Sequence, residues 1–201
     1  MAFLGARARV LLQYRAAAFA GLVTQLFWGL IRVMIFEAFY RASTATQPMS
    51  LEQVVTYVWL GQAVFAMLPW NVEPEIREMI RSGNVVYELL RPVDLYGLWF
   101  TRSLALRLVP TALRAVPLAL AAALALGLQP PASFEAGLTS AAALGLALLL
   151  AAAVTALLSV LLLWTIAGEG LARLSFAAVY VFSGLIVPLP LFPDALRAVI
   201  E

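Results

Sequence analysis

The side chains with the most evident capacity for chemistry lie in one polar segment, residues 71–102, which separates two long apolar stretches. Glutamates and arginines are interspersed along it, and Asp94 follows near its end. Carboxylate and guanidinium groups at this density can form charge-assisted hydrogen bonds with each other or with the surface of a partner. We therefore expect this segment to be a binding surface outside the apolar part of the molecule.

The residue types that the chain lacks narrow the chemistry further. All 13 basic residues are arginine, and lysine, histidine and cysteine do not occur. The chain therefore has no P-loop lysine, no thiolate or imidazole metal ligand and none of the usual nucleophile and base pairs. We expect no catalytic residue, no metal and no cofactor. The net charge of +2 gives no indication of nucleic acid, and we expect none as a partner.

Composition places the chain in a membrane. Hydrophobic residues make up 64% of the 201 residues, charged residues make up 12%, and the mean hydropathy is +0.95. A typical soluble domain has roughly 25% charged residues. Five segments are apolar over about 18 residues or more, the length that a helix needs to cross a bilayer: 16–39, 53–70, 104–128, 137–166 and 171–192. We predict an all-α integral membrane protein in contact with lipid, with five visible transmembrane helices in a single domain, residues 1–201.

The placement of the arginines predicts the orientation in the membrane. Residues 1–15 combine arginines with apolar residues and lack a cleavage site, which favours an interfacial helix over a signal peptide. The connections on one face of the membrane contain more arginines than the connections on the other face. The face with more arginines is expected to be cytoplasmic. This rule places the N-terminus and the loop at 71–102 in the cytoplasm. The short connections at 40–52 and 129–136 are then external.

An odd number of spans would leave the C-terminus outside the cell. Pro188, Pro190 and Pro193 are expected to end the fifth helix, because proline cannot continue a helix. Residues 194–201 then have the spacing of a short external helix. We expect this sequence to be truncated before a sixth span.

Within the polar segment, the spacing predicts two short helical pieces. Residues 75–82 place apolar side chains on one face, and Gly83 follows where a helix commonly ends in a left-handed residue. A second piece, residues 85–90, ends at Arg91 because proline disfavours helix for the residue before it. Two amphipathic pieces joined by a tight turn would form a compact knob. The alternative is a solvated connector without a partner.

These residues carry a family resemblance. The order of an N-terminal interfacial helix, two spans and the segment Ile80-Arg81-Ser82-Gly83-Asn84-Val85-Val86-Tyr87-Glu88-Leu89-Leu90-Arg91-Pro92-Val93-Asp94-Leu95-Tyr96, followed by further spans, resembles the permease subunits of ABC-2 type ABC exporters. It is most similar to the six-span bacterial branch related to daunorubicin-type multidrug permeases. The resemblance covers essentially the whole chain, and the segment quoted above is its most specific part.

The resemblance implies a mechanism and a location. In this family the loop is a coupling helix that docks on a separate ATP-binding cassette subunit, and two like or related permease subunits form the translocation pathway in the bacterial inner (plasma) membrane. The partner-coupling residues would be Ile76, Ile80, Gly83, Tyr87, Glu88, Leu89, Leu90, Arg91 and Pro92. The chemistry of the loop is suited to docking in its own right, because apolar side chains can fill a groove while Glu75, Glu78, Glu88, Arg81 and Arg91 supply charges at its rim.

Three polar residues inside the predicted spans are candidates for the pathway or a subunit interface: Gln25, Gln62 and Arg114. Amides in hydrocarbon commonly hydrogen-bond across helices, so simple interhelical contact is the alternative for the two glutamines. Arg114 lies deep enough to need a partner, a water-filled cavity or an anionic group. Arg32 and Glu37 lie nearer the outer end of the first span, where long side chains can reach the headgroups.

Other functional classes remain open at this point. A secondary transporter would normally show interrupted helices and intramembrane carboxylates for ion coupling, whereas the acidic residues here cluster in loops. A membrane enzyme would need catalytic side chains that the chain lacks. A non-transport membrane scaffold is compatible with the residues. The sequence does not identify a transported substrate.

Overall fold

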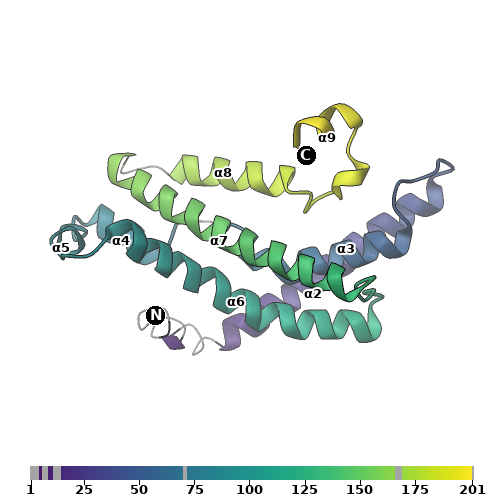
Figure 1. Ribbon diagram of the computed structural model, residues 1–201, viewed down its shortest axis with the longest axis horizontal. Coiled ribbons are helices and arrows are strands. Elements are labelled where there is room, and N and C mark those ends of the chain that lie inside the picture. The colour runs from purple at the N-terminus through teal and green to yellow at the C-terminus, as the bar shows by residue number, and fades with distance from the viewer. Residues whose placement is uncertain (1–4, 6–8, 11–14, 70–71, 166–168, 201) are drawn as a thin grey trace. The chain divides into compact units, whose positions relative to one another are not determined.

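The protein is helical wherever it forms regular structure in the part of the chain described by this computed structural model. That part comprises residues 5, 9–10, 15–69, 72–165 and 169–200, and it contains no strand. In chain order the elements are α2 (Arg15–Ala42), α3 (Leu51–Val64), η1 (Phe65–Met67), α4 (Pro74–Arg81), α5 (Val86–Leu89), α6 (Leu95–Ala125), α7 (Phe134–Thr165), α8 (Glu169–Phe182), η2 (Leu189–Leu191) and α9 (Asp194–Ile200) (Figure 1). The interfacial helix expected at 1–15 lies largely outside the described residues.

Among the described residues, three helices have the length and composition to cross a membrane. They are Phe19–Ala42, Leu95–Ala125 and Phe134–Thr165, with mean hydropathies of 1.7, 1.8 and 2.8. At 1.5 Å per residue even the shortest is longer than the hydrocarbon core of roughly 30 Å. The predicted all-α membrane class is therefore confirmed, and the chain is a multi-pass membrane protein.

The second and fifth apolar segments form shorter helices than expected. The second becomes α3 and continues only into the 3₁₀ turn η1, because Pro69 has no N–H to continue the hydrogen-bond ladder and disfavours helix in the residue before it. The fifth ends at Phe182, well before the three prolines, because Gly184 adopts a φ of +81° and turns the chain. The predicted short helix after the prolines is present as α9.

Contacts divide the chain into two compact units. Unit 1 consists of Met1–Tyr14, Met67–Pro110 and Leu138–Val179, and unit 2 consists of Arg15–Ala66, Thr111–Gly137 and Tyr180–Glu201. The described core of unit 1 contains Val72, Ile76, Trp99, Leu158, Leu162 and Ala172. That of unit 2 contains Trp59, Ala63, Leu118 and Ala122.

Unit 2 is built around the indole ring of Trp59 on α3. This side chain is 1% exposed, and its Nε1 donates a hydrogen bond to the carbonyl oxygen of Leu126 at 2.9 Å. On α2, Gly29 faces the ring so closely that a Cβ added there would lie 2.4 Å from Trp59 Cζ3. Small residues allow this close approach between helices in a membrane. Ser50 starts α3 through a capping box with Gln53 and thereby fixes the turn from α2.

This packing predicts that Gly29→Ala destabilises the protein. The new methyl group would collide with an indole that its hydrogen bond holds in place, which is expected to cost about 1–3 kcal/mol. Gly145→Ala in α7 is the matched control, because no described atom outside the local backbone of its own helix lies within 4 Å of the added Cβ. Thermal unfolding of the two variants in the same detergent measures the difference. Equal melting temperatures would show that the Gly29 contact is not restrictive.

Candidate functional site

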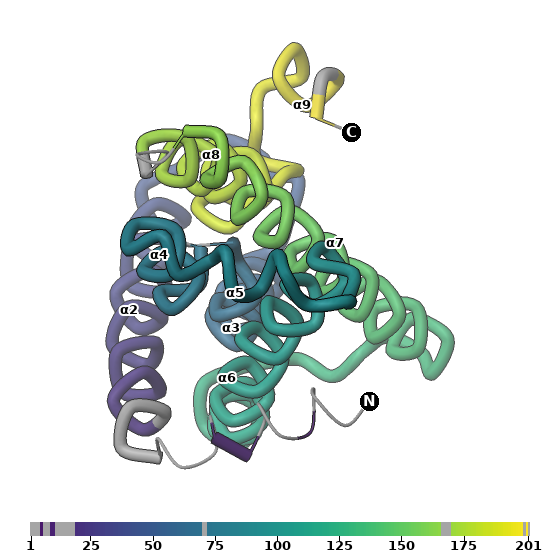
Figure 2. The backbone as a smooth tube through the Cα atoms, turned by 90° about the vertical axis from the view of Figure 1, so that its left-hand side faces the viewer, coloured from purple at the N-terminus to yellow at the C-terminus, as the bar shows by residue number. Residues whose placement is uncertain are grey.

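The polar segment folds into two short helices joined by a left-handed glycine. Pro74 occupies the first position of α4, where its missing N–H costs nothing. Gly83 has a φ of +77° and ends the helix, while the amide of Val85 donates back to the carbonyl of Met79 at 3.0 Å. The predicted helix, glycine turn and second helical piece are therefore all confirmed. Figures 1 and 2 show α4 and α5 beside the first turns of α6.

Arg102 on α6 binds three carboxylates from this segment. Its Nε donates to Glu73 at 2.8 Å, its Nη2 to Glu75 at 2.7 Å and its Nη1 to Glu88 at 3.0 Å. The other carboxylate oxygen of Glu88 accepts a hydrogen bond of 2.7 Å from Trp99 Nε1. We call these five residues the Arg102 cluster. It joins the start of α4, α5 and the first part of α6.

Arg102 and two of its three carboxylate partners are buried, whereas Glu75 is exposed. Glu73 is 1% exposed, Arg102 7% and Glu88 8%. A buried charge that loses its partner costs about 3–5 kcal/mol, far more than a surface ion pair contributes. The planar guanidinium holds its donors in fixed directions, so the three carboxylates also define the geometry of the loop.

The apolar face of α4 contacts the protein's own core. Ile76 is fully buried in the unit 1 core with Trp99 and with Leu158 of α7, and Ile80 packs against the same cluster. The sequence predicted that both isoleucines would fill a groove on a partner. The core of unit 1 covers Ile76, whereas Ile80 is only partly buried, and its contact with a partner stays a prediction. Glu88, predicted at the rim of the docking surface, is likewise internal.

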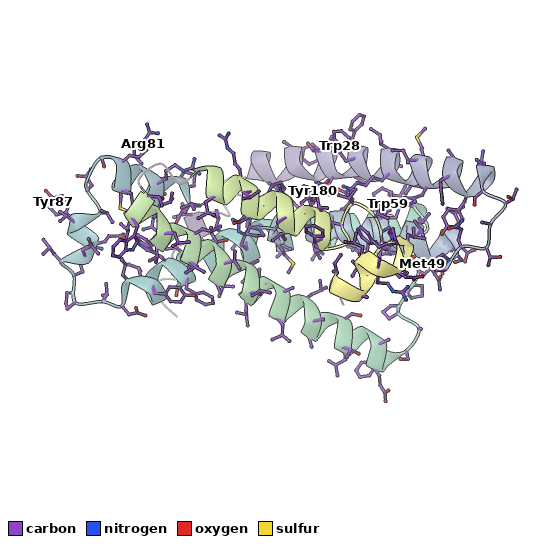
Figure 3. The ribbon with its side chains drawn as sticks, turned by 90° about the horizontal axis from the view of Figure 1, so that it is seen from above. Trp28, Met49, Trp59, Arg81, Tyr87 and Tyr180 are labelled. Carbon is purple, nitrogen blue, oxygen red and sulfur yellow. The ribbon has the colours of Figure 1, made fainter. Side chains whose placement is uncertain are left out.

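The exposed apolar residues of the loop lie on and after α5. Val86, Tyr87, Leu89, Leu90, Val93 and Tyr96 are each at least 44% exposed, and we call this set the α5 patch. Leu90 is the most exposed member at 77%. Tyr87 projects outward from the tip of the loop (Figure 3). Three predicted coupling residues belong to the patch, and Arg91 and Pro92 are exposed beside it.

The three candidate pathway residues all belong to unit 2. Gln25 and Gln62 are buried, at 4% and 2% exposure. The guanidinium of Arg114 lies against α2, where a Cβ on Gly21 would be 2.4 Å from its Cζ. Arg114 Nε and Gln25 Oε1 are buried without a hydrogen-bond partner among the described residues. Because Gly21 and Gln25 are one turn apart, they share a face of α2.

Sequence reasoning missed the roles of Arg102 and Glu73. The positive-inside pattern uses Arg102 only as one of the arginines of residues 71–102. Its position one turn after Trp99 on a helix that begins beside an acidic segment was the available signal. Asp94 is also explained, because its carboxylate accepts a hydrogen bond from the Gly97 amide at 2.9 Å and caps α6.

The cluster predicts that Arg102→Gln loosens the loop. Two buried carboxylates would lose their charged partner, and we expect residues 74–90 to exchange amide hydrogens at least about tenfold faster. Arg81→Gln is the control, because this arginine is exposed and points away from the ribbon (Figure 3). Hydrogen–deuterium exchange with mass spectrometry on the detergent-solubilised chain makes the comparison. Equal protection in both variants would contradict the assigned role of Arg102.

Comparison with known families places this site in context. The family described as ABC-2 family transporter protein matches residues 11–201. Neither the curated proteins nor the solved structures gave a match. The family match covers the α4–α5 loop, the Arg102 cluster and all three long apolar helices. The chain therefore belongs to the ABC-2 transporter family and is a membrane subunit of an ABC transporter.

Proposed function

We propose that the chain is the permease subunit of an ATP-driven exporter and that its α5 patch docks on a separate ATP-binding subunit. The observation that carries this proposal is an exposed apolar patch on a loop that is itself anchored by a buried ion cluster. Aromatic and aliphatic anchors surrounded by charge are typical of protein interfaces. The chain has no lysine from which to build a P-loop, so ATP is hydrolysed by the partner.

The Arg102 cluster supports transmission of motion from the patch to the membrane. Glu88 lies between the patch residues Tyr87 and Leu89, and its two carboxylate oxygens bind Trp99 and Arg102 on α6. A displacement of α5 is therefore carried directly to a helix of 31 residues. Two such permease subunits, alike or related, enclose the pathway. ATP-driven movement of the docked subunits shifts the α6 helix of each permease subunit.

The arginine distribution supports the orientation that this function requires. The ATP-binding subunit works in the cytoplasm, so the N-terminus and residues 71–102 face the cytoplasm of a bacterial inner membrane. The segment at 71–102 is rich in arginine, as the positive-inside rule requires. The connections at 40–52 and 129–136 face the exterior.

Single cysteines test this orientation, because the chain has no thiol of its own. Ser82 and Thr46 are both exposed and lie on opposite predicted sides. In intact cells, an impermeant maleimide should label Thr46→Cys and leave Ser82→Cys unmodified until the membrane is permeabilised. Labelling of Ser82→Cys in intact cells would contradict the orientation.

Docking predicts a specific sensitivity of the α5 patch to charge. Leu90→Asp places an unpaired carboxylate where an apolar anchor is buried on binding, and we expect the affinity for the ATP-binding subunit to fall about 10- to 100-fold. Asn84→Asp is the matched control, because it adds the same charge to an exposed turn of the same loop without removing apolar surface. Titration of the purified ATP-binding subunit against each variant in nanodiscs gives the two affinities.

The two affinities distinguish a loop that docks on the ATP-binding subunit from a loop that is only a solvated connector. If Leu90→Asp and Asn84→Asp bind the ATP-binding subunit as tightly as the unmodified chain does, the α5 patch is not the docking surface. Amide-exchange protection of residues 74–90 should be unchanged in both variants, because neither residue belongs to the Arg102 cluster. This control distinguishes lost docking from an unfolded loop.

A further inference from the structure

Unit 2 contains a pocket that the proposed docking function does not use. Its volume is about 580 Å³, within the range of sites that enclose small ligands. The walls come from α2, from Tyr180 near the end of α8 and from the segment around η2, and they are mostly apolar. Trp28, Phe36, Phe39 and Leu191 are among the lining residues. Arg32 is the lining residue that carries a full charge.

The hydrogen bonds of Arg32 leave its charge unneutralised by any described carboxylate. Its Nη1 donates to the carbonyl oxygen of Leu185 at 2.7 Å, and its Nη2 donates to the hydroxyl of Tyr180 at 2.5 Å. The guanidinium also lies 5.9 Å from the centre of the Tyr180 ring. The nearest acidic residue along α2, Glu37, pairs with Arg41 at 3.8 Å. These neutral partners orient the cation but do not cancel its charge.

The rim of the pocket indicates how a ligand would enter. Trp28, Ile35 and Phe39 line the pocket and are 53%, 61% and 48% exposed. They lie on α2, which is long and apolar enough to cross the bilayer, so this exposed face is suited to hydrocarbon. An apolar ligand could therefore pass from the membrane into the pocket without crossing water. Figure 3 shows Trp28 on α2 and Tyr180 on α8.

We propose that this pocket binds a single-chain amphipathic anion, with its carboxylate or phosphate at Arg32 and its apolar body against Trp28, Phe36 and Phe39. A cation held within an apolar membrane helix is costly unless an anion or water compensates it, and an amphiphile supplies both the anion and the apolar surface. The pocket volume suits one hydrocarbon chain or a drug-sized aromatic body. This proposal does not depend on docking at the α5 patch.

Equilibrium binding to the purified full chain in nonionic detergent tests the site. The probes are oleate and oleyl alcohol, which share the same chain and differ in the anionic head. We expect oleate to bind at least about tenfold more tightly than oleyl alcohol, because a hydrogen bond from a guanidinium to a carboxylate is stronger than one to a neutral hydroxyl. Arg32→Gln should remove this preference, whereas Arg41→Gln, an exposed arginine on the same helix, should retain it.

A second variant keeps the test independent of the stability of Arg32→Gln. Ile186→Trp adds a larger side chain to the pocket wall and leaves Arg32 in place. It should therefore lower the affinities for oleate and oleyl alcohol by about the same factor. Equal binding of oleate and oleyl alcohol to the unmodified chain would overturn the proposal. An unchanged preference in Arg32→Gln, or unchanged affinities in Ile186→Trp, would overturn it as well.

The same ligand chemistry can come from a membrane lipid or from transported cargo. A resident lipid should remain bound when the chain is extracted from its membrane, and native mass spectrometry should detect it in the unmodified chain but not in Ile186→Trp. A cargo should instead raise ATP hydrolysis by the complex with the ATP-binding subunit, with a response that Arg32→Gln abolishes. Either result supports the site and identifies the source of its ligand. If no lipid is detected, ATP hydrolysis is not raised and oleate does not bind, the proposed site is wrong.

Discussion

The guanidinium group of Arg102 binds Glu73, Glu75 and Glu88 and thereby joins three segments of the chain around one buried cation. Neither α4 nor α5 could hold its position alone, since α4 has eight residues and α5 only four. Isolated helices of this length are unstable in water. The geometry of the loop therefore depends on the cluster and on the core that contains Ile76 and Trp99 beneath it.

The residues that hold the loop in place differ from the residues that the loop exposes. Ion pairs and core packing anchor the loop, while the apolar side chains of the α5 patch are exposed. Exposed clusters of large apolar side chains on a polar loop are typical of interaction sites. Because Glu88 belongs to α5 and is bound to Trp99 and Arg102, the α5 patch and the first part of α6 are physically connected.

Two polar side chains of the apolar helices of unit 2 find hydrogen-bond partners within the protein. Trp59 donates to a backbone carbonyl, and Arg32 uses a carbonyl and a tyrosine hydroxyl. Close helix contacts rely on glycine, as at Gly29 beside Trp59 and at Gly21 beside Arg114. In the pocket beside Arg32, the guanidinium has only neutral hydrogen-bond partners and lies next to apolar side chains.

The features that local patterns control were predictable from the sequence. Apolar length gave the membrane class, and Gly83 gave the end of α4, because each depends on neighbouring residues only. The partners of Arg102 were not predictable, because they lie 14 to 29 positions away along the chain. Periodicity likewise identified the apolar face of α4 but could not tell whether the protein's own core or a partner covers it. The early end of α8 depends on the left-handed conformation of Gly184. The sequence prediction instead placed the end of this helix at the prolines that follow.

Site-specific photocrosslinking tests the proposed contact between the α5 patch and the ATP-binding subunit without knowledge of the cargo. Benzoylphenylalanine replaces Tyr87 in one variant and Phe134 in another, since both are exposed aromatic residues and Phe134 lies at the start of α7. We expect irradiation of the assembled transporter to join the ATP-binding subunit to the position 87 variant and not to the position 134 variant. An intact complex that gives no adduct at position 87, or equal adducts at both positions, would contradict it.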